Sequence, residues 1–324
     1  MTKQEQIAKI NKLASKKIPF IFIIDFKTDK IIVIPTDEVN DNEILFSINN
    51  ITNKKEKITQ SNLNEIKFEK YPISINKYAK SYSLVQDNLK QGNTYLTNLT
   101  CETPIKTNLT LKQIFYHSNA TYKLLYNHEF VVFSPETFVK IENGKIMSFP
   151  MKGTIDATIK DAKNIILTDR KEKAEHATIV DLIRNDLSRV ATDVKVDKYR
   201  YIDTIKTNTS NLLQVSSQIS GQLPKNFHQN LGNIIFNLLP AGSISGAPKK
   251  KTVDIIDNTE DYNRGFYTGI FGLFDGENLD SAVMIRFIEN RNGSLFFKSG
   301  GGVTINSKME DEYKEMIQKV YLPF

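Results

Sequence analysis

Short β-rich runs that turn straight back on themselves are the feature that most restricts the fold of this sequence. Residues 20–26 and 30–35 flank the short turn Lys27-Thr28-Asp29, and Glu142-Asn143-Gly144-Lys145 and Asn292-Gly293 join later runs in the same way. Such turns connect antiparallel neighbours. Because the helical patterns come in separate blocks, we expect an α+β fold with antiparallel sheets and not a doubly wound parallel sheet.

The apolar patterns predict the positions of most other elements. Further strands are expected at residues 94–101, 122–126, 130–133, 138–141, 146–149, 267–274, 281–289 and 294–299. Helices are expected at residues 78–90, 111–117, 171–190, 227–239 and 308–321, with another beginning near Pro248 and with Thr168 or Asp169 as the cap of the third. No repeat or linker divides the chain, so residues 1–77 are predicted to be a short N-terminal β-rich part of one continuous fold with residues 78–324.

Composition narrows the class of protein. The 324 residues are 40% hydrophobic and carry a formal net charge of +6, but Lys and Arg are mixed with 37 acids along the chain. A nucleic-acid surface needs clustered basic residues, so none is expected. Cys101 is the single cysteine, which excludes an internal disulfide and favours a reducing compartment. The apolar run 19–25 is too short to span a bilayer. We expect a cytoplasmic protein that binds neither membrane nor nucleic acid.

Two pairs of glutamates have the spacing of one helix face. Glu172 and Glu175 are three residues apart in one predicted helix, and Glu312 and Glu315 repeat this spacing in another. If the two faces met, they would form an oxygen site with few protein ligands, which suits Mg²⁺. The spacing alone is equally typical of solvated helix faces.

Two glycine-rich runs indicate close approach to a ligand. Gly300-Gly301-Gly302 follows a β-rich run, and residues 240–249 lead into a predicted helix. Consecutive backbone N–H groups or a helix start can bind carboxylate or phosphate, although tight turns have the same composition. Neither the P-loop nor the dinucleotide fingerprint is present, so small carboxylates are the better candidates.

Taken in order, these runs resemble the chorismate-utilising enzyme family, which includes anthranilate, aminodeoxychorismate, isochorismate and salicylate synthases. The resemblance covers residues 78–320. The motifs that carry it are Ser134-Pro135-Glu136-Thr137-Phe138, Pro150-Met151-Lys152-Gly153-Thr154, Lys171-Glu172-Lys173-Ala174-Glu175-His176, Glu312-Tyr313-Lys314-Glu315 and the runs 179–187, 240–249 and 299–303.

The resemblance implies a four-layer α/β/β/α fold with two packed, largely antiparallel sheets, a Mg²⁺ ion and chorismate as substrate, with residues 78–324 as the chorismate-binding region. Glu175 and Glu315 would hold the ion, with Glu172 and Glu312 close behind them. The other residues implied in substrate binding are Gly153, Thr154, Gln214, Ser245, Tyr267, Arg286, Gly300, Gly301, Gly302 and Lys319.

Within the family, residue 152 indicates the reaction. Anthranilate and isochorismate synthases have a small residue there, whereas the aminodeoxychorismate synthases resemble this sequence in having lysine. The resemblance implies that Lys152 attacks C2 of chorismate as a neutral amine and is later displaced when ammonia adds at C4. Glu136 would protonate the departing 4-hydroxyl group and needs a raised pKa for this role.

Other positions support or qualify this interpretation. Isochorismate and salicylate synthases activate water with a lysine at the position that Leu96 occupies here, so addition of water is not expected. Gln214 replaces a common family histidine and cannot act as an imidazolium acid, which leaves more of the acid role to Glu136. His176 is predicted to be structural and not a zinc ligand.

No glutaminase triad is apparent in the sequence. Ammonia would therefore come from solution or from a separate glutamine amidotransferase subunit, in a heterodimer. Two alternatives stay open: the chorismate-binding component of an anthranilate synthase that has lysine at position 152, and a non-catalytic regulatory or nucleic-acid-binding protein.

Overall fold

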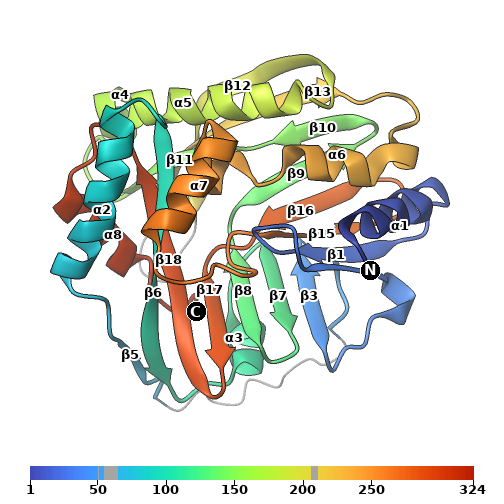
Figure 1. The fold of residues 1–324 in the computed structure, drawn as a ribbon, viewed down its shortest axis with the longest axis horizontal. Coiled ribbons are helices and arrows are strands. Elements are labelled where there is room, and N and C mark those ends of the chain that lie inside the picture. Colours follow the sequence, from blue (N-terminus) through green and yellow to red (C-terminus); the bar gives the residue numbers. More distant parts are fainter. Residues whose placement is uncertain (50, 55–64, 206–210) are drawn as a thin grey trace.

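The computed structural model of the chain describes residues 1–49, 51–54, 65–205 and 211–324. Within them, two antiparallel sheets pack against each other, and their strands cross at a wide angle in the view of Figure 1. The first sheet has the order β11-β13-β10-β9-β16-β15-β1-β2, with β12 paired to β13. The second has the order β14-β6-β18-β17-β8-β7-β3-β4, with β5 paired to β6.

The strands of the first sheet are β1 (Phe20–Ile24), β2 (Ile31–Pro35), β9 (Thr137–Glu142), β10 (Lys145–Ser148), β11 (Met151–Asp156), β12 (Thr192–Ile205), β13 (Leu212–Gln222), β15 (Ile270–Phe274) and β16 (Leu279–Val283). Those of the second are β3 (Ile44–Ile48), β4 (Ile51–Thr52), β5 (Phe68–Lys70), β6 (Leu96–Thr107), β7 (Tyr122–Tyr126), β8 (Phe130–Ser134), β14 (Gly246–Ala247), β17 (Phe287–Arg291) and β18 (Ser294–Val303). The α-helices are α1 (Lys3–Ser15), α2 (Ile75–Lys90), α3 (Leu111–His117), α4 (Ala162–Thr168), α5 (Arg170–Leu187), α6 (Leu231–Leu238), α7 (Lys249–Thr259) and α8 (Met309–Gln318).

Strand β1 shows why one face of each sheet is covered by helices and the other face by the second sheet. Its side chains are all buried, and successive residues of a strand point to opposite faces. Phe20, Phe22 and Ile24 pack in one cluster with residues of α1, α5 and α6, whereas Ile21 and Ile23 pack with β3, β7 and β8 of the other sheet. A strand that is apolar on both faces therefore requires a layer on each side.

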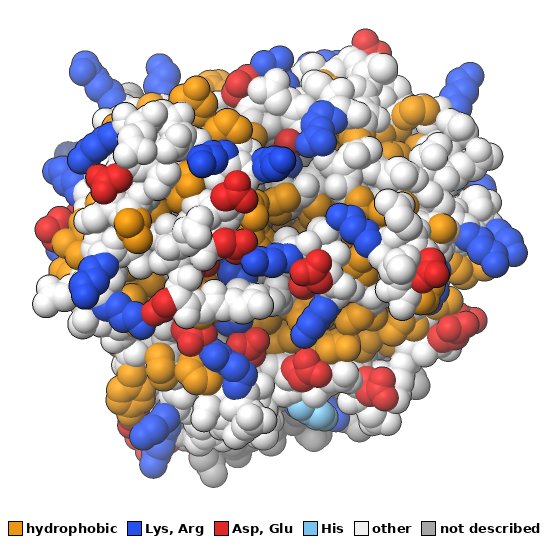
Figure 2. All heavy atoms as spheres, in the orientation of Figure 1, with side chains coloured by type: hydrophobic (Ala, Val, Ile, Leu, Met, Phe, Trp, Pro, Cys, Tyr) orange, Lys and Arg blue, Asp and Glu red, His pale blue; other side chains and the backbone are white. Residues whose placement is uncertain are grey.

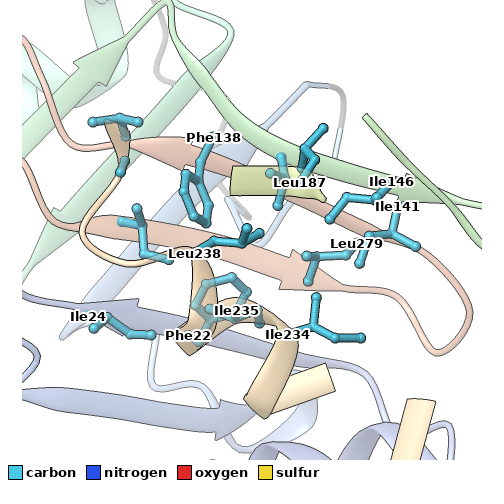
Figure 3. Packing of buried hydrophobic residues seen from close by; sticks show 14 of the residues in the cluster. Phe22, Ile24, Phe138, Ile141, Ile146, Leu187, Ile234, Ile235, Leu238 and Leu279 are labelled. Carbon is cyan, nitrogen blue, oxygen red and sulfur yellow. The ribbon is translucent and has the colours of Figure 1, made fainter. Parts of the chain in front are cut away.

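The outer layers complete the core. Figure 3 shows Leu187 of α5 and Ile234, Ile235 and Leu238 of α6 packed on Phe22 and Phe138 of the first sheet. On the second sheet, α3 packs beside β7 and β8, and α2 and α8 pack on β6 and β18. The structure thus confirms the α+β class and the four-layer α/β/β/α arrangement.

Most of the predicted elements are present within a few residues of their expected limits. The hairpin β1–β2 has the predicted antiparallel register, and α5 is capped by Asp169, whose carboxylate accepts a hydrogen bond from the Glu172 N–H. The predicted helix at 227–239 is a short 3₁₀ turn, Phe227–Asn230, followed by α6.

The prediction of one strand over residues 281–289 was wrong. The chain leaves the first sheet after β16 and enters the second at β17, and Arg286 between them has a left-handed φ of 54°. The continuous β-type pattern hides this change of sheet, because residues on both sides of it are buried. Gly300-Gly301-Gly302 is likewise part of β18 and not a turn.

Surface charge agrees with the mixed pattern of the sequence. On the face in Figure 2, basic and acidic side chains are interspersed. Across the part of the chain that the structure describes, no helix has the length and apolar character needed to cross a membrane.

Gly272 is expected to be a sensitive position in the first sheet. A Cβ atom there would lie 2.5 Å from the Phe22 Cζ and 2.6 Å from the Ser281 Cβ. Overpacking of this kind costs about 1–3 kcal/mol, so Gly272→Ala should lower the free energy of unfolding by that amount in denaturant titrations. Adding Phe22→Leu should restore part of the lost free energy of unfolding. Strictly additive effects of the two substitutions on this free energy would contradict the proposed clash.

Candidate active site

Helices from the two outer layers bring the predicted glutamate pairs together. Glu172 and Glu175 lie in the first turns of α5, and Glu312 and Glu315 lie on α8. Glu175 and Glu312 are buried, with only 7% and 5% of their surface exposed. The link between the helices is Lys171, whose Nζ lies 3.7 Å from the Glu175 Oε1 and 3.6 Å from the Glu312 Oε1. The two acidic faces therefore share one site.

Lys152 points into this acidic site. It lies on β11, and its Nζ donates a hydrogen bond of 2.7 Å to the Glu175 Oε2. A Cβ atom added at Gly302 would lie 3.6 Å from the same Nζ. The lysine thus lies between α5 and the end of β18 and not on the outer surface.

The charge state of Lys152 differs from the neutral amine that a nucleophile needs. Burial lowers the pKa of Lys152, but the carboxylates of Glu175, Glu315 and Glu172 more than offset this, so the pKa lies above its ordinary value. In the ligand-free site the lysine is an ammonium ion. Attack on a substrate would require that it first lose a proton.

Lys319 forms an ion pair with Glu315, one of the two glutamates of α8. Its Nζ donates to the Glu315 Oε1 at 2.6 Å and to the Gly300 carbonyl at 2.8 Å. Burial lowers the pKa of Lys319, with Arg286 adding to the effect and Glu315 opposing it. The contact ties the C-terminal end of α8 to the glycine run of β18.

The glycines of β18 let the acids approach the strand. Pairing with β17 ends at Lys298, so no strand of the described residues pairs with the glycines on that edge of β18. A Cβ atom at Gly301 would lie 3.4 Å from the Glu312 Oε2 and 3.5 Å from the Glu315 Oε1. These two are ordinary van der Waals distances, whereas a Cβ atom at Gly300 would lie 2.2 Å from the Leu99 carbonyl oxygen, so the pairing with β6 excludes a side chain there.

The donor set of the two helices suits a metal ion with few protein ligands. Within the described residues, no three His, Cys, Asp or Glu side chains are arranged to hold a metal by themselves. However, the Glu172 Oε2 and the Glu175 Oε1 are buried without a hydrogen-bond partner there. Burial and a neighbouring carboxylate also raise the pKa of Glu172. Mg²⁺ needs only one or two carboxylates besides water and substrate oxygens, so these residues fit it.

Glu136 lies between β8 and β9, where it makes a contact that the sequence did not predict. The Ser243 hydroxyl donates a hydrogen bond to the Glu136 Oε1, and both residues line one pocket. Burial raises the pKa of Glu136, opposed by this hydrogen bond and by the charges of Arg286, Lys319 and Lys152. The raised pKa is the property that the role of a general acid needs.

Arg286 and Tyr267 border the same region. The Arg286 Nε donates to the Tyr321 hydroxyl at 3.3 Å, and its guanidinium lies 5.6 Å from the centre of that ring. Tyr267 is buried, and its ring meets the edge of Phe287 at 5.8 Å. The charge of Arg286 acts on both Glu136 and Lys319, which links this cation at the change of sheet to the site.

The remaining predicted residues are placed as follows. Thr154 on β11 is paired with Gln214 on β13. Gly153 has φ of 82°, and a Cβ atom there would lie 2.9 Å from the Glu172 Oε2, so glycine is required beside the acid. Leu96 is buried on β6, which pairs with β18, and a Cβ atom added at Gly302 would lie 3.0 Å from its side chain.

Ser245 and His176 have structural contacts. The buried Ser245 hydroxyl donates to the Ala241 carbonyl at 2.8 Å, so it stabilises its own loop. The His176 Nε2 is hydrogen-bonded to the Ser217 hydroxyl at 2.7 Å, and burial lowers its pKa to about 4. His176 is therefore neutral near pH 7 and holds α5 on β13. Ser243 in the same loop as Ser245 is the residue that reaches the site.

Known proteins are similar to this chain over most of its length. The family model for the chorismate binding enzyme matches residues 18–323. An uncharacterized PabA-like protein of Haemophilus influenzae is 48% identical over 322 residues, which cover 99% of this chain and 97% of that protein. Component 1 of the aminodeoxychorismate synthase of Escherichia coli is 31% identical over 259 residues, or 75% of this chain and 56% of that one. The crystal structure of anthranilate synthase component I from Streptococcus pneumoniae superposes with a TM-score of 0.66 and 26% identity, covering 79% of this chain and 59% of that chain.

Replacing Ser243 with alanine is expected to move the alkaline limb of the pH–rate profile to higher pH. The hydroxyl favours the carboxylate form of Glu136, so its removal raises the pKa of that group and keeps it protonated further into the alkaline range. The measurement is kcat/KM against pH. Ser245→Ala, in the same loop but without a Glu136 contact, should leave the limb in place. A limb that moves equally in both variants would contradict the role of Ser243.

Proposed function

The chain belongs to the family of chorismate binding enzymes, and on this basis we propose that it is the chorismate-converting component of an aminodeoxychorismate synthase. The reaction would join chorismate and ammonia to form 4-amino-4-deoxychorismate and water. The observation that carries the proposal is the position of Lys152, whose Nζ lies in the site beside Glu175 and the glycine edge of β18.

Lys152 would act as the nucleophile. Its deprotonated amine attacks C2 of chorismate, the two conjugated ring double bonds each shift by one bond, and the 4-hydroxyl group leaves C4. Ammonia then adds at C4, the double bond shifts back, and the lysine amine leaves C2. Division of one difficult substitution into two steps is the general advantage of covalent catalysis.

Glu136 would supply the proton for the leaving hydroxyl, which departs as water. Burial keeps the pKa of this carboxyl above its ordinary value, so the protonated form is available at higher pH than for an exposed glutamate. Ser243 donates to the Oε1, which leaves the Oε2 to carry the transferable proton. Gln214, where many relatives have histidine, offers no second acid of this kind.

The cations and acids of the site would orient the substrate. Arg286 and Lys319 can pair with one carboxylate of chorismate, with Tyr267 beside them. Glu175 and Glu315, supported by Glu172 and Glu312, would hold Mg²⁺, which supplies positive charge for the other carboxylate. A substrate anchored at two ends presents its ring to Lys152 in a fixed orientation.

Leu96 argues against addition of water to the ring. It lies beside Lys152 at the glycine edge, at the position where the sequence resemblance expects a water-activating lysine in isochorismate and salicylate synthases. An alkyl side chain cannot remove a proton from water. This supports amination over hydroxylation.

An anthranilate synthase component is the alternative from the same family. Overall similarity does not decide between them, because named relatives of both kinds resemble the chain to a comparable extent. The presence of lysine at position 152, with its amine in the site, favours amination at C4. The ammonia would come from solution or from a separate glutamine amidotransferase subunit.

Lys152→Ala should abolish amination at C4. With chorismate, Mg²⁺ and ammonium, the unmodified protein should form a product that a lyase converts to 4-aminobenzoate. Removal of a catalytic nucleophile costs on the order of a thousandfold or more in kcat, so the variant should be essentially inactive. Mass spectrometry of the acid-quenched protein should find a chorismate-derived adduct on Lys152.

The control is Lys163→Ala, which removes an exposed lysine from α4. It should retain both turnover and adduct. Direct formation of fluorescent anthranilate would overturn the proposed reaction. Full turnover by a correctly folded Lys152→Ala variant would overturn the assignment of the nucleophile.

A further inference from the structure

Lys171 occupies a position that no catalytic role requires. It stands in the first turn of α5, and its ammonium group lies within 3.7 Å of the Glu175 Oε1 and 3.6 Å of the Glu312 Oε1. These distances are ion-pair contacts that are longer than a hydrogen bond. The side chain is 42% exposed, whereas Glu175 and Glu312 are buried. A flexible cation thus reaches from solvent to two buried carboxylates.

The carboxylates that Lys171 contacts need positive charge. The Glu175 Oε1 is buried without a hydrogen bond to any described residue, since Lys152 takes the other oxygen of this carboxylate. Burial and the nearby carboxylates of Glu315 and Glu175 also raise the pKa of Glu312. A buried carboxylate without a compensating charge is costly, so Lys171 reduces a repulsion that would otherwise act between the two helices.

The contact also joins two layers of the fold. Helix α5 packs on the first sheet, and α8 packs on the second. Lys171 is the described residue whose ion pairs connect a carboxylate of α5 with one of α8. Its charge therefore influences how closely the two acidic faces lie.

We propose that Lys171 is a displaceable counter-ion that holds the two glutamate pairs together until a divalent cation takes its place. The inference rests on the proposed function for the assignment of Mg²⁺ to these acids. The Glu175 Oε1, which Lys171 faces, is among the oxygens available to the metal, so the ion and the ammonium group compete for it. The long, half-exposed side chain of Lys171 can move into solvent without disturbing the core.

Competition of this kind sets the affinity of the empty site for metal. A tethered ammonium is always present at high local concentration, so it weakens metal binding in the absence of substrate. A substrate carboxylate adds negative charge and favours the divalent ion over the monovalent lysine. Lys171 would thereby link retention of the metal to the presence of substrate.

The test is the dissociation constant for Mg²⁺ in the absence of chorismate, measured by isothermal titration calorimetry. Lys171→Met should bind Mg²⁺ at least about fivefold more tightly, which is the effect of removing one unit charge at this distance under strong solvent screening. Lys171→Arg keeps the charge and should stay near the unmodified value.

Lys173→Met is the matched control. Lys173 lies in the same helix and is exposed, and its side chain makes no hydrogen bond or ion pair with a described residue, so its replacement removes the same charge without the contact. Its effect on Mg²⁺ binding should be clearly smaller. If both methionine variants bound Mg²⁺ more tightly by the same factor, the effect would come from net charge alone and the proposal would be overturned. Weaker Mg²⁺ binding by Lys171→Met would also overturn it.

Thermal unfolding gives an independent readout. In EDTA, Lys171→Met should lower the Tm by about 2 °C or more relative to Lys173→Met, because the glutamates lose their counter-ion. Saturating Mg²⁺ should remove the difference in Tm between the two variants. No Mg²⁺ binding by the unmodified protein would overturn the inference. Failure of C4 amination, with the affinity pattern as expected, would overturn the proposed reaction alone.

Discussion

Repulsion between buried carboxylates is the constraint on which the rest of the site depends. Helices α5 and α8 each present a pair of glutamates, and two of the four side chains are buried. Close carboxylates in such a place are stable only where positive charge compensates them. The structure supplies it from three directions: Lys152 on β11, Lys171 on α5 and Lys319 at the end of α8. The same arrangement explains why a divalent cation is expected there.

The four-layer fold makes this arrangement possible. The acidic faces belong to helices on opposite outer layers, so they can meet only where the two sheets end close together. The glycine edge of β18 provides that place, because the glycines have no side chains and their pairing with β17 has ended, which leaves only β6 as a described neighbour. Arg286 reaches the same region from the point where the chain changes sheets. Residues far apart in sequence, on β11, α5, β18 and α8, therefore meet at one site.

The sequence predicted the parts of the structure that have local signals. Tight turns predicted the hairpins, and the helical spacing of the glutamates predicted both acidic faces. Of the two predicted caps of α5, Thr168 and Asp169, the structure selects Asp169. The sequence could not predict the change of sheet near Arg286, because an apolar strand pattern continues through it. Ser243 was missed because one serine in a glycine-rich loop resembles another, and only the folded loop turns Ser245 inward and Ser243 toward Glu136. The charge state of Lys152 could not be predicted from the sequence either, since it depends on acids that only the tertiary structure brings near.

Under the proposed function, the choice of reaction would depend on a small part of a shared site. A dicarboxylate can be held by the acids, Arg286 and the glycine edge, whichever reaction takes place on its ring. This agrees with the comparable similarity of the chain to relatives that are named for different reactions. Lys152 and Leu96 lie together at Gly302, one with an amine and the other without any proton-accepting group. Under the proposed function, which of these positions carries nitrogen would decide the chemistry at the substrate ring. A change of reaction would then need no change in the charges that bind the substrate.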